Sequence, residues 1–400
     1  MRKKIALITP GFLPVPAVKG GGSEMLITKL INQNEMEKLF DIDLYTIDDK
    51  RINEKSYKLT NVVRIRTKFL NNFVAKIINK IANFLSLEIH VNPYGNVVSK
   101  LLKKTKYDYL LIENNMYIFK KINKTYPYEC KKIFHLHNDV GGIDKPIKLC
   151  KYIGKNADLI LTVSEYLKEH FLKYTSVKRI EVLYNCIDVN QFKFDLHIRE
   201  KYRKKYNIDN AEFIFLYVGR ISKEKGLLPL VMSFSEMAKT HKNVKLFVVG
   251  DIWFGKKKKS SYLTEINRAI SEIKEQVFFV GSQPIDEVSN FMSMADCIVV
   301  PTICEEAFGL VATEAMATSR ALIVTDSGGL PEVVDASCAK IISRKNLVEN
   351  LKNVMEKLLD DNNMVKQMGR NGYERIMCKT EFQEQNYLKN FTIKLKGIDD

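Results

Sequence analysis

The sequence has little of the residues that mark unusual classes of chain. Its 400 residues include only 10 prolines and 19 glycines, which excludes a fibrous or linker-like chain. Hydrophobic residues make up 46% and charged residues 28%, a balance that excludes a mostly disordered chain. A length of 400 residues is typical of two or three domains.

The seven cysteines include no C-x-x-C pair, so no zinc-ribbon or thioredoxin-like motif is present. An odd number of cysteines without such a framework is typical of reduced thiols in the cytoplasm. No run of 18 apolar residues could span a membrane, and the apolar N-terminal stretch stops at Pro10 without a signal-peptide cleavage site. We therefore expect a cytoplasmic protein, and peripheral attachment to the inner membrane face stays open.

Basic residues outnumber acidic ones by 63 to 47, which gives a formal net charge of +16. The excess is concentrated in residues 1–195, which hold 33 basic and 20 acidic side chains. A basic half indicates an anionic acceptor or a membrane face as partner, and the residue usage of an AT-rich genome explains it equally well. Nucleic acid is not favoured, because the basic residues are not interleaved with aromatic ones in a recognisable module.

Short, β-branched apolar runs alternate with helical patterns along the whole chain. Most runs show no polar alternation, which is typical of strands buried on both faces of a parallel sheet. The predicted strands are residues 5–9, 42–46, 62–65, 109–112, 133–136, 159–163 and 182–183, followed by 213–218, 245–249, 277–280, 297–300, 321–324 and 340–342.

Helical segments between these strands predict βαβ units and an α/β fold. The two series of strands predict two doubly wound, Rossmann-like domains at residues 1–190 and 195–380. We expect the seam in the polar, basic stretch 195–210. A C-terminal helix at about 382–400 is expected to pack back on the first domain.

Residues 69–87 carry apolar side chains at the 3.6-residue spacing of an amphipathic helix. The polar face of this helix carries Lys76 and Lys80, and no acidic residue occurs before Glu88. A basic amphipathic helix can lie in a lipid interface. It can equally pack on its own domain, and the sequence does not separate the two.

A glycine-rich segment, Gly20-Gly21-Gly22-Ser23-Glu24, follows the first predicted strand and opens a helix. Glycines let backbone N–H groups approach a phosphate closely, and a helix N-terminus adds partial positive charge. The spacing matches neither the dinucleotide nor the P-loop motif. A phosphate site and a tight turn both fit this segment.

Two cations follow the predicted strand 213–218. Gly219-Arg220 ends this strand, and Lys225-Gly226 opens the next helix. Ligands of open α/β sheets gather at the carboxyl ends of strands. An arginine and a lysine five residues apart suit a diphosphate, because arginine can bind it through two N–H groups and lysine adds a point charge.

The stretch from Glu306 to Glu314 holds two glutamates with seven residues between them, after strand 297–300 and leading a helix. Eight helical positions rise about 12 Å, so the two carboxylates cannot share a proton and would instead hold two ends of an extended ligand. Backbone N–H groups near Phe308, Gly309 and Leu310 would face phosphates between them. Two surface glutamates remain the alternative explanation for this spacing.

Together these segments resemble the retaining family 4 glycosyltransferases of the two-domain GT-B fold. The resemblance runs from residue 20 to residue 332 in the family's order. The family usually has glycine where Cys186 and Ser319 stand, so we expect altered turns there. The matching segments are Gly20-Gly21-Gly22-x-Glu24, Asn185-Cys186-Ile187-Asp188, Tyr217-Val218-Gly219-Arg220-(x)4-Lys225-Gly226, the E-x7-E stretch and Gly328-Gly329-Leu330-Pro331-Glu332.

The resemblance implies two Rossmann-like domains facing each other across a cleft, the first binding the acceptor and the second the nucleotide-sugar donor. It implies that Arg220 and Lys225 bind the donor diphosphate and assist its departure. Glu314 would bind the ribose and Glu306 the donor sugar. The loop of Gly21 and Gly22 would close over the phosphates, and the remaining expected donor-site residues are Gly219, Phe308, Gly309 and Leu310.

His135 and His137 end the predicted strand 133–136 and point the same way. In the family a histidine at this strand end reaches the transferred sugar, which implies His137, and His135 fits a core role. A metal pair fits the spacing, but we expect no further ligand nearby. The D-x-D pattern of Asp41 and Asp43 opens a predicted strand and is interpreted as structural, so no metal and no other cofactor are expected.

The resemblance implies a retaining, metal-independent hexosyltransferase. Its donor would be a nucleotide sugar, foremost a UDP-sugar, and its acceptor a glycan or a lipid-linked intermediate of surface-polysaccharide synthesis. A catalytically weak structural or accessory protein and a sugar-nucleotide epimerase are the alternatives. The presence of Arg220, Lys225, Glu306 and Glu314 argues against a decayed site.

Overall fold

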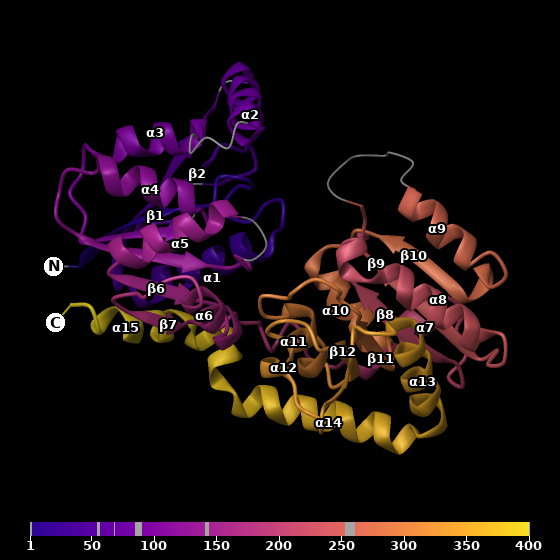
Figure 1. Cartoon of the computed structure of the whole chain (residues 1–400). Coiled ribbons are helices and arrows are strands. Elements are labelled where there is room, and N and C mark those ends of the chain that lie inside the picture. The colour runs from indigo at the N-terminus through magenta and orange to yellow at the C-terminus, as the bar shows by residue number, and fades with distance from the viewer. Residues whose placement is uncertain are drawn as a thin grey trace. The chain divides into compact units, whose positions relative to one another are not determined.

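The computed structural model describes residues 2–53, 57–67, 69–84, 90–140, 144–252 and 261–399. The chain divides into two compact units. Unit 1 comprises Met1–Asn185 and Gln385–Asp400, and unit 2 comprises Cys186–Glu384. Each has a parallel β-sheet with helices on both faces, as Figure 1 shows. The predicted α/β class with two Rossmann-like sheets is confirmed.

Unit 1 has a seven-stranded sheet within its described residues. Its strands are β1 (Lys3–Ile8), β2 (Phe40–Ile47), β3 (Thr60–Ile65), β4 (Tyr109–Glu113), β5 (Lys131–Leu136), β6 (Leu159–Thr162) and β7 (Ile180–Val182). Its helices are α1 (Gly22–Glu37), α2 (Phe69–Phe84), α3 (Pro93–Leu102), α4 (Met116–Thr125), α5 (Asp144–Asn156), α6 (Glu165–Leu172) and α15 (Tyr387–Lys396).

The strand order of unit 1 is β3-β2-β1-β4-β5-β6-β7, and neighbouring strands are parallel. Central strands are buried on both faces, as Ala6, Leu7 and Ile8 of β1 show, and this explains their apolar, non-alternating sequences. The order reverses between β1 and β4. Ligands of open sheets bind at the carboxyl ends of the strands beside such a reversal.

The C-terminal helix α15 belongs to unit 1 although it follows unit 2 in sequence. The backbone N–H of Leu388 donates to Oε1 of Gln33 on α1, at 2.8 Å. The ring of Phe391 packs edge-on against Phe40 of β2, with centroids 6.3 Å apart. These buried contacts tie α15 to the first unit.

Unit 2 has a six-stranded sheet within its described residues, again with parallel neighbours. Its strands are β8 (Phe213–Val218), β9 (Val244–Val249), β10 (Val277–Gly281), β11 (Cys297–Val300), β12 (Ala321–Thr325) and β13 (Ala339–Ile342), in the order β10-β9-β8-β11-β12-β13. Its helices are α7 (Leu196–Lys205), α8 (Leu227–Ala238), α9 (Ser261–Ala269), α10 (Ile285–Met294), α11 (Leu310–Ala317), α12 (Leu330–Val333), α13 (Leu347–Asp360) and α14 (Asn362–Cys378).

Each predicted apolar run corresponds to one of these strands, but the expected seam does not lie at 195–210. The units instead separate at Asn185/Cys186, and much of the stretch 195–210 forms α7 inside unit 2. Two of its basic residues are held there, because Arg199 and Arg203 bind the two carboxylate oxygens of Asp296 at 2.6 and 2.7 Å. The polar sequence therefore reflects an ion-paired helix rather than a linker.

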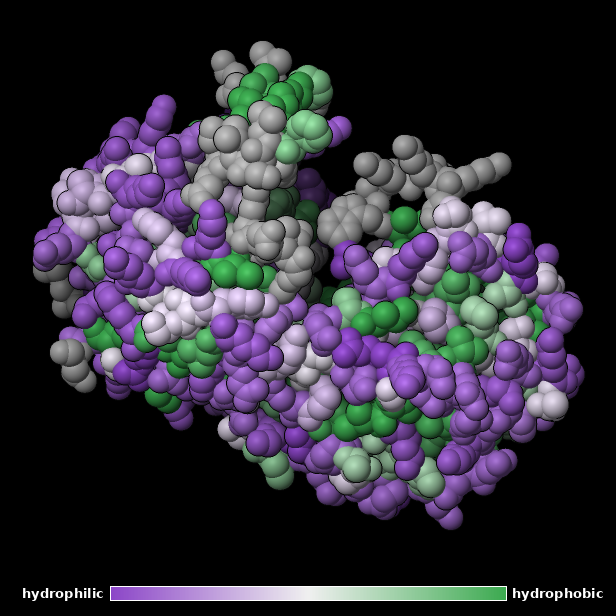
Figure 2. All heavy atoms as spheres, viewed as in Figure 1, coloured by the Kyte–Doolittle hydropathy of each residue, from purple (hydrophilic) through white to green (hydrophobic). Residues whose placement is uncertain are grey.

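Helix α2 turns its large apolar side chains outward from unit 1. The described side chains that it buries are the small Ala75 and Ala82, whereas Phe73, Ile77 and Ile81 are 52%, 44% and 53% exposed. Figure 2 shows the hydrophobic side chains gathered where Figure 1 places α2. Residues 85–87 of the predicted helix lie outside the described residues. Among the described helices, none has the length and apolarity that a membrane span requires.

Candidate functional site

The strand end of β8 brings together two of the predicted site residues of unit 2. Nζ of Lys225 lies 2.5 Å from Oε2 of Glu306, and both side chains are largely but not fully buried. Lys225 ends a short 3-10 turn, and Gly226 then takes a left-handed conformation (φ 71°) before α8 begins. A Cβ on Gly226 would lie 1.8 Å from the carbonyl oxygen of Pro301, so a side chain there would displace the turn.

Glu306 is fixed by a second segment that follows β12. Its backbone N–H donates to Oγ of Ser327 at 3.0 Å, and its carbonyl accepts from the N–H of Gly329 at 2.7 Å. Gly328 takes φ 49°, and a Cβ there would lie 2.2 Å from the Glu306 carbonyl oxygen. The conformation of Glu306 therefore depends on Ser327 and on the two glycines. The sequence identified these glycines as part of a family motif but did not indicate this role.

Helix α11 begins at Leu310, with Gly309 as its N-cap in a positive-φ conformation (φ 111°) and with no side-chain cap. Its first N–H groups are therefore not capped by a side chain, as the expected phosphate contact requires. Phe308 is 1% exposed and packs edge-on against Phe382, with centroids 5.5 Å apart. Its side chain belongs to the core, so only its backbone could contact a ligand.

The two glutamates of the E-x7-E stretch do not lie on one helix, as our helical-rise argument assumed. Glu306 precedes α11 on a loop, and only Glu314 is helical and nearly buried. The prediction of a single helix through both glutamates was wrong, because α11 begins at Leu310, four residues after Glu306, with Gly309 as its N-cap. The two other predicted residues of this edge, Gly219 and Arg220, follow β8 directly.

The glycine-rich segment of unit 1 forms the entry to α1. Gly20 and Gly21 have φ values of 72° and 105°, and Gly22 is the first helical residue. A Cβ on Gly21 would lie 2.3 Å from a carboxylate oxygen of Glu24, so Gly21 leaves room for that side chain. Burial raises the pKa of Glu24 above its usual range. Glu24 was not among the predicted site residues, although the motif contains it.

Three buried side chains meet at the carboxyl ends of β4 and β5. Oε2 of Glu113 lies 3.1 Å from Nδ1 of His135 and 2.7 Å from Nε2 of His137. Burial opposes ionisation of Glu113, but the charges and hydrogen bonds of His135 and His137 outweigh it and lower its pKa to about 2. Burial, followed by the charge of His135, lowers the pKa of His137.

Glu113 overturns the expectation that no further ligand lies near the two histidines. Two histidines and a carboxylate could in principle hold a divalent cation. However, Nε2 of His135 is buried without a hydrogen-bond partner among the described residues. A histidine that binds a metal through Nδ1 carries a proton on Nε2 and normally donates it. The orphaned nitrogen therefore does not fit a metal site.

The sequence held a signal for Glu113 that we did not use. Glu113 directly ends the buried run 109–112, at the strand edge where ligands of parallel sheets bind. The D-x-D aspartates, in contrast, behave as the structural interpretation predicts. Asp41 pairs with Arg2 at 2.9 Å, and Asp43 pairs with Lys4 at 3.1 Å.

A cavity of about 400 Å³ opens in unit 1 at the carboxyl ends of β4 and β5. Leu136 and Asn138, which flank His137 in sequence, line it. Its walls also include the imidazole of His90 stacked on the ring of Tyr117, with centroids 3.7 Å apart. A stacked ring pair next to amide side chains offers both an apolar face and hydrogen-bonding groups.

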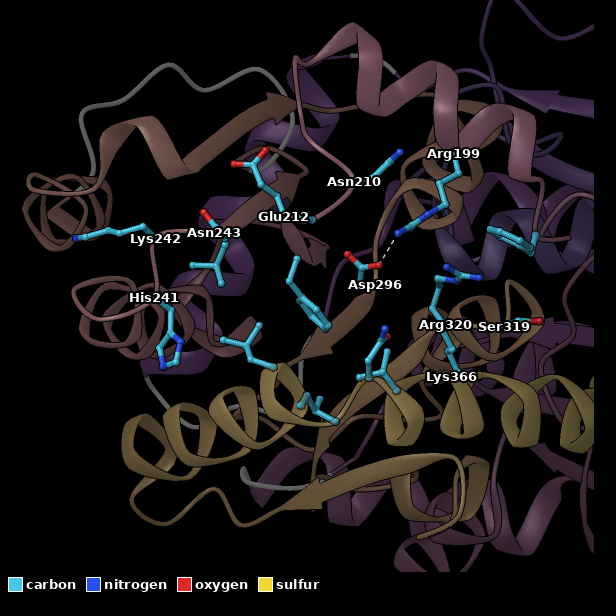
Figure 3. Close-up of a pocket in the computed structure, with 18 of the residues that line it drawn as sticks. Arg199, Asn210, Glu212, His241, Lys242, Asn243, Asp296, Ser319, Arg320 and Lys366 are labelled. Carbon is cyan, nitrogen blue, oxygen red and sulfur yellow. Dashed lines mark hydrogen bonds and ion pairs between the residues drawn. The ribbon is translucent and has the colours of Figure 1, made fainter.

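A cavity of about 960 Å³ in unit 2 lies at the amino ends of β8 and β9, away from the predicted site residues (Figure 3). Figure 3 shows Arg199, Asp296 and Arg320 together at one end of it. Arg320 donates to the carbonyl oxygens of Thr318 and Ala295, at 2.9 and 3.2 Å. Thr318 is the C-cap residue of α11, and Ala295 is the C-cap residue of α10. Arg320 thus stabilises two helix C-termini.

Comparisons with known proteins agree with this geometry. Residues 198–375 match the family model described as Glycosyl transferases group 1. The chain is 30% identical over 226 residues to the lipopolysaccharide 1,2-N-acetylglucosaminetransferase of Salmonella typhimurium, an alignment that spans 56% of each chain. It is 24% identical over 385 residues to YtcC of Bacillus subtilis, which covers 93% of this chain and 87% of that protein.

The solved structure of Anabaena HepE in complex with UDP and glucose superposes with a TM-score of 0.77 at 17% identity, covering 99% of this chain and 100% of that one. This likeness shows the GT-B fold. The residues that match the group 1 glycosyltransferase model, 198–375, lie within unit 2. Its alignment with the Salmonella enzyme spans only about half of that protein's length.

Proposed function

We propose that this protein is a retaining, metal-independent hexosyltransferase that uses a nucleotide-sugar donor. The observation that carries the proposal is the Lys225–Glu306 pair at the carboxyl end of β8, inside the family domain. In this reading Arg220 and Lys225 bind the donor diphosphate, and the uncapped start of α11 adds its N–H groups. Glu314 binds the ribose. The UDP and glucose in the HepE complex support a UDP-sugar as donor.

The proposed chemistry relies on preorganised charge rather than on a metal. When the bond between sugar and diphosphate breaks, negative charge develops on the leaving phosphate, and Lys225 and Arg220 would stabilise it. Glu306 would then be released from its ion pair and stabilise the electron-poor sugar. The acceptor hydroxyl would attack from the face that the diphosphate leaves, so that the anomeric configuration is retained.

We place the acceptor in unit 1, in the 400 Å³ cavity at the carboxyl ends of β4 and β5. The stacked His90–Tyr117 pair suits the apolar face of a sugar ring, and the amides of Asn114 and Asn138 suit its hydroxyls. A glycan or lipid-linked acceptor of surface-polysaccharide synthesis fits these groups. The lipopolysaccharide enzyme among the relatives supports this acceptor class.

We also propose that α2 docks unit 1 onto an anionic membrane surface at the inner membrane face. The outward apolar side chains include Phe73, Ile77 and Ile81, and Lys76 and Lys80 lie between them in sequence and are exposed. An exposed apolar stripe with lysines at its border is the arrangement of an interfacial helix. Packing on its own unit, the alternative from the sequence, would have buried these side chains.

The transferase proposal is tested with UDP-, GDP- and dTDP-sugars, by measuring nucleotide release with and without a lipid-linked or glycan acceptor. We expect acceptor-dependent release from one UDP-sugar and a product with the anomeric configuration of the donor. An altered sugar nucleotide without acceptor would identify an epimerase instead. Absence of both turnover and nucleotide binding would favour a structural or accessory protein.

The membrane proposal is tested by co-sedimentation with phosphatidylglycerol and phosphatidylcholine vesicles. We expect binding to the anionic vesicles, and its loss when Phe73, Ile77 and Ile81 are changed to serine. Met232, Phe279 and Ile393 are exposed apolar residues on other elements, and changing these three to serine provides the matched control. Equal binding of both triple variants would contradict the proposal.

A further inference from the structure

The backbone around His137 is fixed by the residue that follows Glu113. Asn114 takes a left-handed conformation (φ 48°), and its N–H donates to the carbonyl oxygen of His135 at 2.8 Å. Oδ1 of Asn114 in turn accepts from the N–H of His137 at 3.0 Å. The end of β4 therefore determines how β5 ends. Asn114 thus fixes the backbone of His137, and the preceding residue, Glu113, fixes its ring.

The ring hydrogen bonds determine which nitrogens carry protons. An ionised carboxylate only accepts hydrogen bonds, so both nitrogens that face Glu113 must be protonated. These are Nδ1 of His135, the cross-strand partner of Glu113, and Nε2 of His137. When each ring is neutral, the unprotonated nitrogens are Nε2 of His135 and Nδ1 of His137. The orphaned Nε2 of His135 agrees with this, because a buried N–H without an acceptor would cost more than a lone pair.

The ring of His137 must also be neutral for its assignment to hold. His137 is buried, and burial together with the neighbouring imidazole disfavours its charged form. The groups whose charges act on it come from three elements: Glu24 on α1, Glu113 on β4 and His135 on β5. Glu24 is itself buried, which favours its neutral form. Glu113 then carries a negative charge, which two N–H donors stabilise.

We propose that Glu113 is a positioning residue, which holds His137 in its Nε2–H tautomer so that Nδ1 accepts a hydrogen bond from a sugar hydroxyl. Nδ1 of His137 has no hydrogen-bond partner among the described residues, and Leu136 and Asn138, which flank His137 in sequence, line the 400 Å³ cavity. The ligand part of this inference rests on the proposed function, whereas the tautomer does not. Toward the sugar, His137 therefore accepts a hydrogen bond at neutral pH, whereas its Nε2–H donates to Glu113.

The tautomer is measured directly by ¹⁵N NMR of protein labelled at histidine. The chain has six histidines, so a His137→Gln spectrum assigns the resonance. We expect the wild-type His137 to show a protonated Nε2 and an unprotonated Nδ1 at pH 7. A protonated Nδ1 would overturn the proposal, and this outcome requires neither activity nor any Glu113 variant to fold.

Glu113→Gln tests the cause of the tautomer. A carboxamide can donate as well as accept, so it no longer forces a proton onto Nε2. We expect a mixture of His137 tautomers and a fall of about tenfold in kcat/KM, the scale of one lost hydrogen bond to substrate. His135→Gln removes the other hydrogen bond to the same carboxylate, so the His137 tautomer should persist in it. An unchanged tautomer in Glu113→Gln would overturn the role of Glu113.

The two proposals fail in different ways. If no donor is turned over but His137 keeps the Nε2–H tautomer, the proposed function fails and the positioning role of Glu113 stands. If a UDP-sugar is turned over but His137 carries its proton on Nδ1, the proposed function stands and the positioning role fails. Binding of UDP to unit 2 is not expected to depend on Glu113.

Discussion

The Lys225–Glu306 pair of unit 2 lies on segments between strands and helices, whereas the buried cluster of unit 1 lies at strand ends. Lys225 and Glu306 follow different strands, and glycines at 226 and 328 fit the loops that hold them. In unit 1, by contrast, Glu113 and His135 are directly opposite each other in the ladder of β4 and β5. Hydrogen bonds between neighbouring strands therefore position Glu113 and His135 of unit 1. Close backbone contacts at glycines position Lys225 and Glu306 of unit 2.

This difference also separates what each set can do. The Lys225–Glu306 pair is partly exposed and balanced in charge, so a diphosphate can replace the carboxylate as partner of the lysine. Glu113 is buried with two imidazoles, and an incoming anion would meet a negative charge there. We therefore assign charge stabilisation to unit 2 and orientation of a neutral hydroxyl to unit 1.

The largest expected effect comes from removing either member of the unit 2 pair. Glu306→Ala and Lys225→Ala should each reduce turnover by about 10²-fold or more, the scale of losing one preorganised electrostatic group. Steady-state nucleotide release measures this. Lys223→Ala, an exposed lysine on the same short turn, is the control and should be near normal. Near-normal transfer by both site variants would remove the basis for assigning the donor to unit 2.

A smaller effect tests whether close backbone contacts place Glu306. In Gly328→Ala the new Cβ would meet the Glu306 carbonyl oxygen at 2.2 Å, so the loop must shift. A displacement on this scale should lower kcat by about 10- to 100-fold. Gly281→Ala is matched, because Gly281 also has positive φ (73°) but its Cβ would meet no atom within 4 Å. Similar kcat values for the two variants would show that Glu306 tolerates the shift.

A third prediction concerns the stability of unit 1 in acid. The pKa of His137 is lowered on folding, so the unfolded chain takes up its proton first as pH falls below about 6.5. The free energy of unfolding should therefore decrease as pH falls from 6.5 to 5. The low pKa of Glu113 adds a further loss below about 4.5, because the unfolded carboxyl protonates first there as well.

Urea midpoints at a series of pH values, followed by circular dichroism, measure this dependence. His137→Gln should flatten it between pH 6.5 and 5, whereas His197→Gln, at an exposed position in unit 2, should leave it unchanged. Identical slopes for wild type and His137→Gln would show that the ring is not held neutral.

The smallest effect concerns a turn where the sequence departs from the family. We expected Ser319 to alter its turn, but it takes the left-handed conformation (φ 54°) that glycine adopts easily. Ser319→Gly should therefore raise the free energy of unfolding by up to about 1 kcal/mol. Thr318→Gly, with φ −82°, should lower it instead. A loss of stability in Ser319→Gly would show that the serine makes a compensating contact.

The strands were predictable from sequence because burial on both faces leaves a continuous apolar signature. Each of the predicted runs is a strand, within one or two residues at most ends. The seam was not predictable from composition, because the charged stretch that resembled a linker is a helix whose arginines bind Asp296. An ion pair across 90 or more residues leaves no local signal.

The candidate site was predictable where a residue lies next to a strand end or a glycine motif. Lys225 and Glu306 carry such signals, and the structure brings them together. The burial of the Phe308 ring was not predictable, because Phe382, against which it packs, is distant in sequence. Glu113 was missed because we read its strand only for hydrophobicity and stopped at residue 112.

The measurement that tests the account most directly is the affinity for UDP by isothermal titration calorimetry. Wild type, Lys225→Ala and Glu113→Gln are compared, each alongside its rate of acceptor-dependent UDP release. We predict that Lys225→Ala weakens UDP binding by at least about tenfold, the scale of a hydrogen-bonded charge. Glu113→Gln should bind UDP like wild type although its turnover is reduced. Wild-type protein that does not bind UDP, or equal loss of affinity in both variants, would contradict the division of roles between the two units.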